Sequence, residues 1–308
     1  MKKILFLTLS NIGDVILTLP ILDFLRAEYA DAKITVMVGP RPRQIFEGNP
    51  YIDKVIVYDK HARFKDQIRL FRQLKKEKFD IVLDLRNSLF GALLPAREKG
   101  MAAAFIPRRL KHMKDRHMFR NRALLKKEPL GRQETTLFIN PKDRARLKEL
   151  FIQRGIAGDD TVVVISAGAR SHIKRWPKEK FLELISRLIE ETRCKVILVG
   201  DKDDINTAKY IVENCRHPIV DFTGKTTIPE LAYLLERANL VITNDSAVLH
   251  LASYLNSNIV AIFGPTNEAK YGPWSDNWAV VRKEIFCRPC QKAQCRFGTL
   301  ECMSLIKV

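Results

Sequence analysis

The sequence has no apolar run that approaches the about 20 residues of a membrane-spanning helix. Its apolar start, at residues 4–9, is followed by no signal-peptide cleavage site, so we expect a cytoplasmic protein. Neither disorder nor collagen-like character fits the composition, because 46% of the residues are hydrophobic and there are only 14 Gly and 14 Pro. We therefore expect a folded chain with a substantial core.

The length of 308 residues is about twice that of a usual ~150-residue domain. Short apolar runs alternate with amphipathic stretches, a pattern typical of βαβ units and parallel sheets. Strands are expected at residues 3–9, 33–38, 55–58, 81–84, 161–166, 195–200, 220–222, 240–243 and 259–263. Helices are expected at residues 15–25, 177–192, 204–215, 228–237 and 246–255. The sequence thus predicts an α/β fold of two Rossmann-like parallel-sheet domains facing a cleft, residues 1–155 and 156–308, with a linker at 154–160.

Positive charge is in excess, at +18, and it is concentrated in the first half of the chain. Residues 97–132 hold twelve Lys and Arg against three acidic residues, and residues 60–78 hold eight against two. A solvated basic face and a surface for anionic lipid or nucleic acid both fit this pattern. The apolar hexapeptide 101–106, inside the more basic segment, favours a membrane surface.

The first strand is followed by a loop that contains a single glycine, Gly13. It therefore matches neither the G-x-G-x-x-G pattern of dinucleotide-binding proteins nor the P-loop, which argues against nicotinamide binding. Asp14, at the start of the next helix, fits an N-cap. On a loop at the carboxyl end of a strand it also fits a general base that accepts a proton from a hydroxyl group.

Two loops of the second half combine small, cationic and helix-capping residues. The first joins Gly168 and Ala169 to Arg170 and Lys174, a set suited to a diphosphate, although an ordinary surface loop also fits. In the second, Asp245 or Ser246 is placed to cap a helix whose N-terminus favours phosphate. The remaining candidates for this pocket are His250, one turn along that helix, and Gly264 and Thr266 after the next strand.

Four of the six cysteines, Cys287, Cys290, Cys295 and Cys302, form a C-x2-C-x4-C-x6-C pattern in the tail, residues 285–308. Such close spacing suits one tetrahedral thiolate site better than disulfides in a reducing compartment. Since a second C-x2-C is missing, structural zinc, an iron–sulfur cluster and four free thiols all fit.

Several short motifs, in this order, resemble the heptosyltransferases of glycosyltransferase family 9. They are Ile12-Gly13-Asp14-Val15 with Leu19-Pro20, Asn49-Pro50-Tyr51-Ile52-Asp53, Asp84-Leu85-Arg86-Asn87, Lys174-Arg175-Trp176-Pro177, Asn244-Asp245-Ser246 with His250-Leu251-Ala252, and Phe263-Gly264-Pro265-Thr266. The resemblance spans nearly the whole chain, and it implies the two-domain GT-B fold.

The resemblance also implies function: inverting, metal-independent transfer of a sugar, usually from ADP-heptose, to the inner core of lipopolysaccharide. Asp14 matches the family's general base and Lys174 the lysine that neutralises the donor phosphate. The donor-binding residues would be Asp245, Ser246 and His250, with Asp204 near the ribose in place of a family Glu. Ala247 and the pair Ala169-Arg170 depart from the family's pattern, which leaves the donor open.

On this reading the first domain binds an anionic, lipid-linked glycan acceptor at the inner face of the cytoplasmic membrane, and the second binds the nucleotide-diphosphate sugar. No catalytic cofactor and no nucleic-acid partner are expected. The alternatives are a transferase with another nucleotide sugar, a metal-dependent enzyme using Asp201-Lys202-Asp203, a sugar-nucleotide epimerase, and a basic nucleic-acid-binding protein with a zinc-knuckle-like tail.

Overall fold

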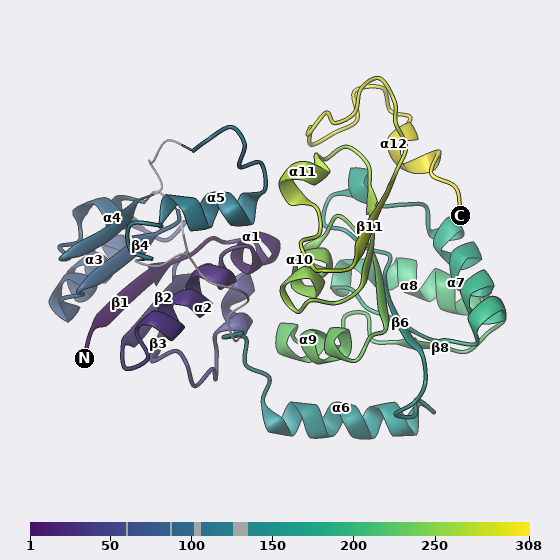
Figure 1. The fold of residues 1–308 in the computed structure, drawn as a ribbon, viewed down its shortest axis with the longest axis horizontal. Coiled ribbons are helices and arrows are strands. Elements are labelled where there is room, and N and C mark those ends of the chain that lie inside the picture. Colours follow the sequence, from purple (N-terminus) through teal and green to yellow (C-terminus); the bar gives the residue numbers. More distant parts are fainter. Residues whose placement is uncertain (60, 87, 102–105, 126–134) are drawn as a thin grey trace. The chain divides into compact units, whose positions relative to one another are not determined.

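A computed structural model describes residues 1–59, 61–86, 88–101, 106–125 and 135–308. The chain forms two compact units, Met1–Phe138 and Ile139–Val308 (Figure 1). Parts of both basic segments, including Lys60, Lys126, Lys127 and Arg132, lie outside the described residues, as does most of 101–106. No helix in the described part of the chain has the length and apolar composition needed to cross a bilayer.

The first unit is built on a five-stranded parallel sheet in the order β3-β2-β1-β4-β5. Its strands are β1 (Lys3–Leu7), β2 (Lys33–Val38), β3 (Lys54–Val57), β4 (Ile81–Asp84) and β5 (Glu98–Met101). The central strand β1 is buried from Ile4 to Leu7 without alternation, as expected for a parallel sheet covered on both faces. The helical segments are α1 (Ile12–Ile16), α2 (Leu19–Glu28), η1 (Arg41–Ile45), α3 (Phe64–Glu77), α4 (Leu89–Leu93) and α5 (Met113–Arg120).

The second unit is built on a six-stranded parallel sheet in the order β11-β10-β9-β6-β7-β8. Its strands are β6 (Val162–Ser166), β7 (Lys195–Leu198), β8 (Ile219–Asp221), β9 (Leu240–Asn244), β10 (Ile259–Phe263) and β11 (Trp278–Arg282). The helical segments are α6 (Pro141–Gln153), η2 (His172–Lys174), α7 (Lys178–Thr192), η3 (Lys202–Asp204), α8 (Ile205–Asn214), α9 (Ile228–Glu236), α10 (Ala247–Tyr254), α11 (Glu268–Tyr271) and α12 (Glu301–Ser304).

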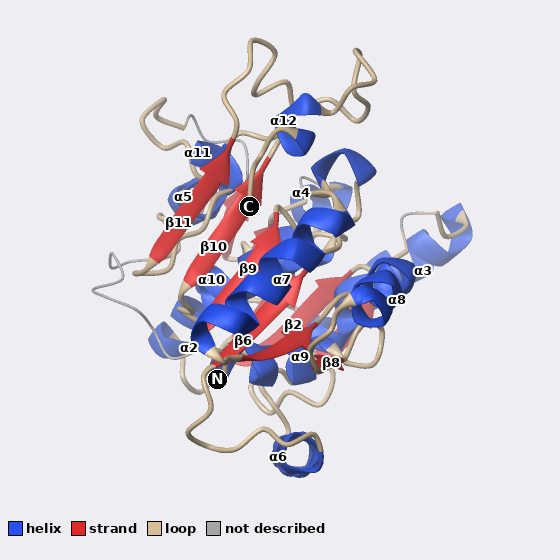
Figure 2. Cartoon of the chain, turned by 90° about the vertical axis from the view of Figure 1, so that its right-hand side faces the viewer, coloured by secondary structure: helices blue, strands red, loops and turns tan. Residues whose placement is uncertain are grey.

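One face of the second sheet is covered by α7, which crosses the parallel strands in Figure 2. Phe181 and Ile185 of α7 share a core cluster with strand residues such as Val163 and Ile242. The C-terminal segment joins the same cluster through Cys302, Met303 and Ile306, so that the tail is an integral part of the domain core. This burial, rather than helix propensity, holds the short helix α12.

The predicted strands are confirmed to within two residues at each end, and three of them, β2, β4 and β10, coincide with the prediction. The predicted helix at 15–25 is wrong as a single element, because the chain forms α1 and α2 with a break at Leu17 and Thr18. The Thr18 hydroxyl donates to the Val15 carbonyl oxygen at 2.6 Å, and Pro20 has no amide hydrogen to continue α1.

Two strands were not predicted: β5, of sequence Glu-Lys-Gly-Met, and β11, which is mostly exposed. Both lie at the edge of a sheet. The sequence of β5 carries no apolar run, whereas β11 has a short apolar run, Trp278–Val281, that is mostly exposed. The boundary between the units falls after Phe138, earlier than the expected 155/156. Helix α6 groups with the second unit, where Arg144 pairs with Glu236 at 2.9 Å and Arg146 pairs with Glu230.

Candidate functional site

Each sheet has a point where the strand order reverses, and the loops at the carboxyl ends of the strands diverge there. In the first unit this point lies between β1 and β4, and Asp14 follows β1. In the second unit it lies between β6 and β9, whose following loops carry the Lys174 and Ser246 groups. Topology therefore puts the candidate residues of each unit where open parallel sheets bind ligands.

Asp14 lies in the first turn of α1, whereas the N-cap position belongs to Asn11. The Asn11 side-chain amide donates to Asp14 Oδ2 at 2.9 Å, which fixes the orientation of the carboxylate. The carboxylate is half-buried, and its negative charge lies at the positive end of a helical turn. Asp14 thus presents an oriented carboxylate beside the point where the strand order reverses. The alternative of Asp14 as N-cap is wrong, because Asn11 occupies that position.

His117 is a buried imidazole of α5 that the sequence reasoning missed; only 3% of its surface is exposed. Burial, together with the positive charges of Arg120 and Arg116, lowers the pKa of His117 to about 4, and the charge of Asp14 opposes this shift. The ring is therefore neutral near pH 7 and does not neutralise the Asp14 carboxylate. No sequence pattern separated this histidine from the exposed residues of the same basic segment.

In the second unit three predicted residues meet at one carboxylate oxygen. Asp245 Oδ2 is 2.8 Å from Lys174 Nζ and accepts a hydrogen bond from Thr266 Oγ1 at 2.5 Å. Asp245 is buried, whereas 28% of the Lys174 side chain is exposed. The carboxylate thus holds the ammonium in place at the end of a partly exposed side chain, an arrangement suited to an anion.

Asn244 ties the loops after β6 and β9 together. Its side-chain amide donates to the Ala167 and Gly168 carbonyls at 2.9 and 3.2 Å, and its Oδ1 accepts from Trp176 N at 3.2 Å. The next residue but one, Ser246, is the N-cap of α10 and accepts from Val248 N at 3.2 Å. The free N–H groups of this helix therefore begin beside Lys174 and favour an anion.

Gly168 and Asp204 are in close contact at the same edge of the sheet. A Cβ at residue 168 would lie 2.0 Å from the Asp204 carboxyl carbon, so only glycine fits. Asp204 accepts from Asp201 N at 3.1 Å as part of a capping box, and Arg175 Nη2 lies 3.9 Å away. Burial raises the pKa of Asp204. Arg175 also donates through Nε to the Ala169 carbonyl at 2.7 Å, and this hydrogen bond fixes the backbone of the loop after β6.

The other predicted residues are spread around this centre. His250 is buried in α10, with its ring stacked on Trp274 at 5.8 Å between centroids. Arg170 is exposed on the loop after β6. Gly264 accepts from Arg288 Nε at 2.7 Å, and a Cβ there would lie 2.3 Å from Met303 Sδ.

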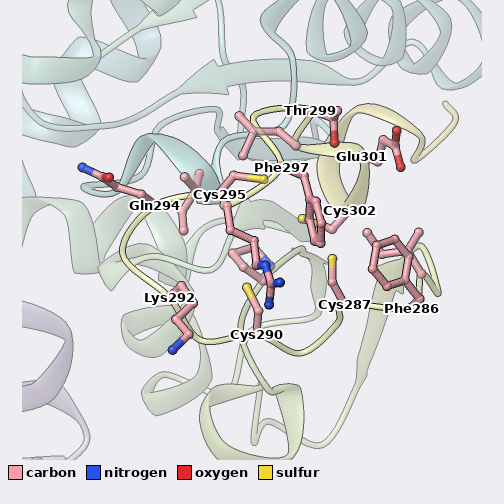
Figure 3. A pocket seen from close by; sticks show the side chains of 15 residues that line it. Phe286, Cys287, Cys290, Lys292, Gln294, Cys295, Phe297, Thr299, Glu301 and Cys302 are labelled. Carbon is pink, nitrogen blue, oxygen red and sulfur yellow. The ribbon is translucent and has the colours of Figure 1, made fainter.

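The four tail cysteines line one cavity (Figure 3), and all carry free thiols. Ile173 and Pro265 line the same cavity. Backbone amides, first that of Leu300, lower the pKa of Cys295, whereas burial raises the pKa of Cys302. Among the described residues no three His, Cys, Asp or Glu side chains converge as they would around a bound metal ion. Of the three alternatives, zinc, an iron–sulfur cluster and four free thiols, this conformation of the described residues shows the free thiols.

Besides His117, the residues missed from the sequence are three that support others: Asn244, Arg175 and Trp274. Asn244 and Arg175 stand inside the quoted motifs, but their role depends on contacts with backbone groups of another loop. A polar residue that ends a buried strand, as Asn244 does, is the one feature that pointed to such a role.

Comparison with known proteins gives the class of the molecule. A solved structure described as a glycosyltransferase of family 9, from Veillonella parvula, superposes with a TM-score of 0.82 at 25% identity and covers 99% of this chain and 94% of its own. The structure of Escherichia coli ADP-heptose LPS heptosyltransferase II superposes with a TM-score of 0.73 at 21% identity, covering 92% and 91%. The two parallel-sheet domains are thus those of a GT-B glycosyltransferase.

The family model described as glycosyltransferase family 9 (heptosyltransferase) matches residues 67–301. The chain belongs to this family, and it is a glycosyltransferase. Among curated proteins, lipopolysaccharide heptosyltransferase 3 of Escherichia coli is 28% identical over 309 aligned residues, covering 89% of this chain and 88% of its own. The resemblance inferred from the motifs is confirmed.

The low pKa of His117 predicts acid-sensitive stability. Because the unfolded chain takes up this proton near pH 6.5 and the folded chain only near pH 4, the free energy of unfolding should fall as pH decreases through this window. The contribution of His117 is about 3 kcal/mol at pH 4 relative to pH 7. In thermal unfolding from pH 4 to 7, His117→Gln should flatten the profile, whereas exposed His61→Gln should not. Identical profiles for wild type and His117→Gln would contradict the assignment.

Proposed function

We propose that this chain transfers heptose from ADP-heptose to the inner core of lipopolysaccharide, with inversion at the anomeric carbon and no catalytic metal. The observation that carries the proposal is the convergence of Lys174 and Thr266 on Asp245 beside the N-terminus of α10, within a family 9 glycosyltransferase. ADP-heptose is the donor named for the E. coli enzyme described above, and lipopolysaccharide is the substrate named for the curated relative.

The second unit binds the donor in this proposal. Lys174 Nζ and the first amides of α10 face the diphosphate, with Gly168, Ala169 and Arg170 on the neighbouring loop. Asp245 is already occupied by a cation and a hydroxyl donor, so it positions Lys174 instead of contacting phosphate. Ser246, His250, Gly264 and Thr266 shape the same wall, and Asp204 lies towards the ribose.

The first unit binds the acceptor and supplies the base. Asp14 accepts the proton of the acceptor hydroxyl as its oxygen attacks the anomeric carbon on the face opposite the diphosphate. The bond from that carbon to the diphosphate oxygen breaks, and ADP leaves with the bonding electrons. Lys174 and the α10 amides stabilise the developing negative charge, which is the electrostatic work that a divalent ion performs in metal-dependent transferases.

We also propose that the first unit touches the anionic inner leaflet of the cytoplasmic membrane, where the lipid-linked acceptor resides. Leu89 and Leu93, one turn apart on α4, are 76% and 63% exposed. Helix α3 packs beside α4, with Phe71 and Phe90 at 6.1 Å between ring centroids, and it carries exposed basic residues. An apolar strip beside a basic helix suits a negatively charged bilayer.

Asp14→Asn should reduce kcat for heptose transfer by roughly 10²–10⁴-fold, because the amide does not accept the proton. The thermal stabilisation by ADP-heptose should stay, since Asp14 does not bind the donor. Asp31→Asn, at an exposed carboxylate after α2, is the matched control and should keep full turnover. Wild-type turnover in Asp14→Asn would remove Asp14 as base.

Lys174→Met should lower the affinity for ADP-heptose by about tenfold or more, since a charge-assisted hydrogen bond contributes about 1.5–3 kcal/mol. Thermal shift against ADP-heptose, UDP-sugars and GDP-sugars measures both this loss and the donor preference. The double variant Lys174→Met/Asp245→Asn avoids a buried unpaired carboxylate, and exposed Lys202→Met is the control. Unchanged affinity in both Lys174 variants would exclude the phosphate role, and stabilisation by UDP-sugars alone would exclude ADP-heptose.

Leu89→Ser/Leu93→Ser should reduce cosedimentation with vesicles of anionic phospholipid by several-fold, while the rate on a soluble, delipidated acceptor stays unchanged. Ile152→Ser, which removes an equally exposed side chain from α6, is the control. Equal vesicle binding by the three proteins, or binding that ignores the anionic lipid content, would count against this surface.

A further inference from the structure

The feature that the transfer reaction leaves unexplained is the cysteine-lined cavity of the tail. This cavity, of about 290 Å³, is lined by residues of 285–302 and by Ile173 and Pro265 of the donor-side loops. The four thiols stand around it in Figure 3.

The donor set around the cavity is chemically uniform. Cys302 is buried, and Cys287, Cys290 and Cys295 are half-buried. Its lining contains no histidine, and Glu301 is its one carboxylate. Four sulfur donors with a single carboxylate beside them are the set that a tetrahedral zinc or iron ion prefers, whereas hard cations such as Mg²⁺ prefer oxygen ligands.

The backbone around the cysteines turns back on itself twice. Gln291, directly after Cys290, and Gly298 have left-handed φ angles of 52° and 73°, and they turn the chain back on itself after each cysteine segment. With these turns, Cys287, Cys290, Cys295 and Cys302 all reach the wall of one cavity.

From this arrangement we propose that Cys287, Cys290, Cys295 and Cys302 bind a single thiophilic divalent metal ion as a structural tetrathiolate site. The thiols surround the cavity without meeting at one point in the present conformation. Binding therefore requires their sulfur atoms to turn inward from the cavity wall as they lose their protons. No redox step is involved, since the ion replaces four protons at sulfur.

The tail is joined to the loop that carries Thr266. Arg288 Nε donates to the Gly264 carbonyl at 2.7 Å, and Gln291 N donates to the Pro265 carbonyl at 2.9 Å. Ile173, which precedes Lys174, lines the cavity itself. A metal ion that fixes residues 287–302 would consequently fix the backbone on both sides of the Lys174–Asp245–Thr266 contact.

The first experiment is metal analysis of the full-length protein, purified under reducing conditions without chelator. About one zinc or iron ion per chain is expected, and elemental analysis distinguishes the two. Cys287→Ser and Cys295→Ser should lose the ion, whereas Cys215→Ser, at a half-buried cysteine outside the cavity, should retain it. A metal-free protein with four titratable tail thiols would overturn the proposal.

A second measurement covers the case in which the serine variants fail to fold. The metal is first removed from the wild-type protein with a thiol reagent and a chelator, and the cysteines are then reduced. Co²⁺ should bind in its place. The cobalt protein should then show the absorption of tetrahedral thiolate coordination. A cobalt spectrum without sulfur-to-metal charge transfer would exclude the site even where metal is found in the preparation.

The consequence for the donor loop rests on the proposed function and is tested separately. Metal-free protein should have a KM for ADP-heptose raised by about tenfold with a smaller change in kcat, because the ion positions binding groups and takes no part in the reaction. Readdition of zinc should restore the KM. Metal binding without this KM effect would contradict the coupling between the tail and the donor loop. The activity of Asp14→Asn tests the proposed transfer reaction and is independent of metal binding.

Discussion

The candidate site of the second unit depends on the contacts of the Asp245 carboxylate with Lys174 and Thr266. The carboxylate is buried, and burial of a charge is costly unless the charge is paired. Lys174 and Thr266, from two other loops, supply the pairing at a single oxygen atom. The three loops at the reversal point of the sheet are thereby held in one arrangement before any ligand arrives, and preorganisation of this kind lowers the entropic cost of binding.

The same arrangement explains how a diphosphate leaving group is stabilised by protein groups. A fixed ammonium and the amides of a helix N-terminus need no reorganisation as charge develops, which makes them effective in a site that excludes water. In the first unit, buried His117 is neutral near pH 7 and therefore forms no ion pair with the Asp14 carboxylate. The switch point of the first unit thus carries a half-buried carboxylate, Asp14, and that of the second unit carries a partly exposed ammonium, Lys174.

The sequence was sufficient to predict the α/β class, the family and nearly every central strand, because buried parallel strands leave continuous apolar runs. It was insufficient at β5, whose sequence carries no apolar run, and at β11, whose short apolar run is mostly exposed. It was also insufficient at α1–α2, where a side-chain hydrogen bond of Thr18 ends the helix. Lys174, Asp245 and Thr266 were predicted individually from motifs. Their meeting at one oxygen depends on three loops distant in sequence, as does the bracing role of Asn244.

Gly264 illustrates how tightly distant segments of the second unit are matched. The space that its side chain would fill is taken by Met303, and its carbonyl is taken by Arg288. The tail and the loop after β10 therefore cannot diverge independently during evolution. A C-terminal segment transplanted from a relative would fit only beside a loop that leaves the same vacancy, so the two stretches form one exchangeable block in any chimaeric enzyme.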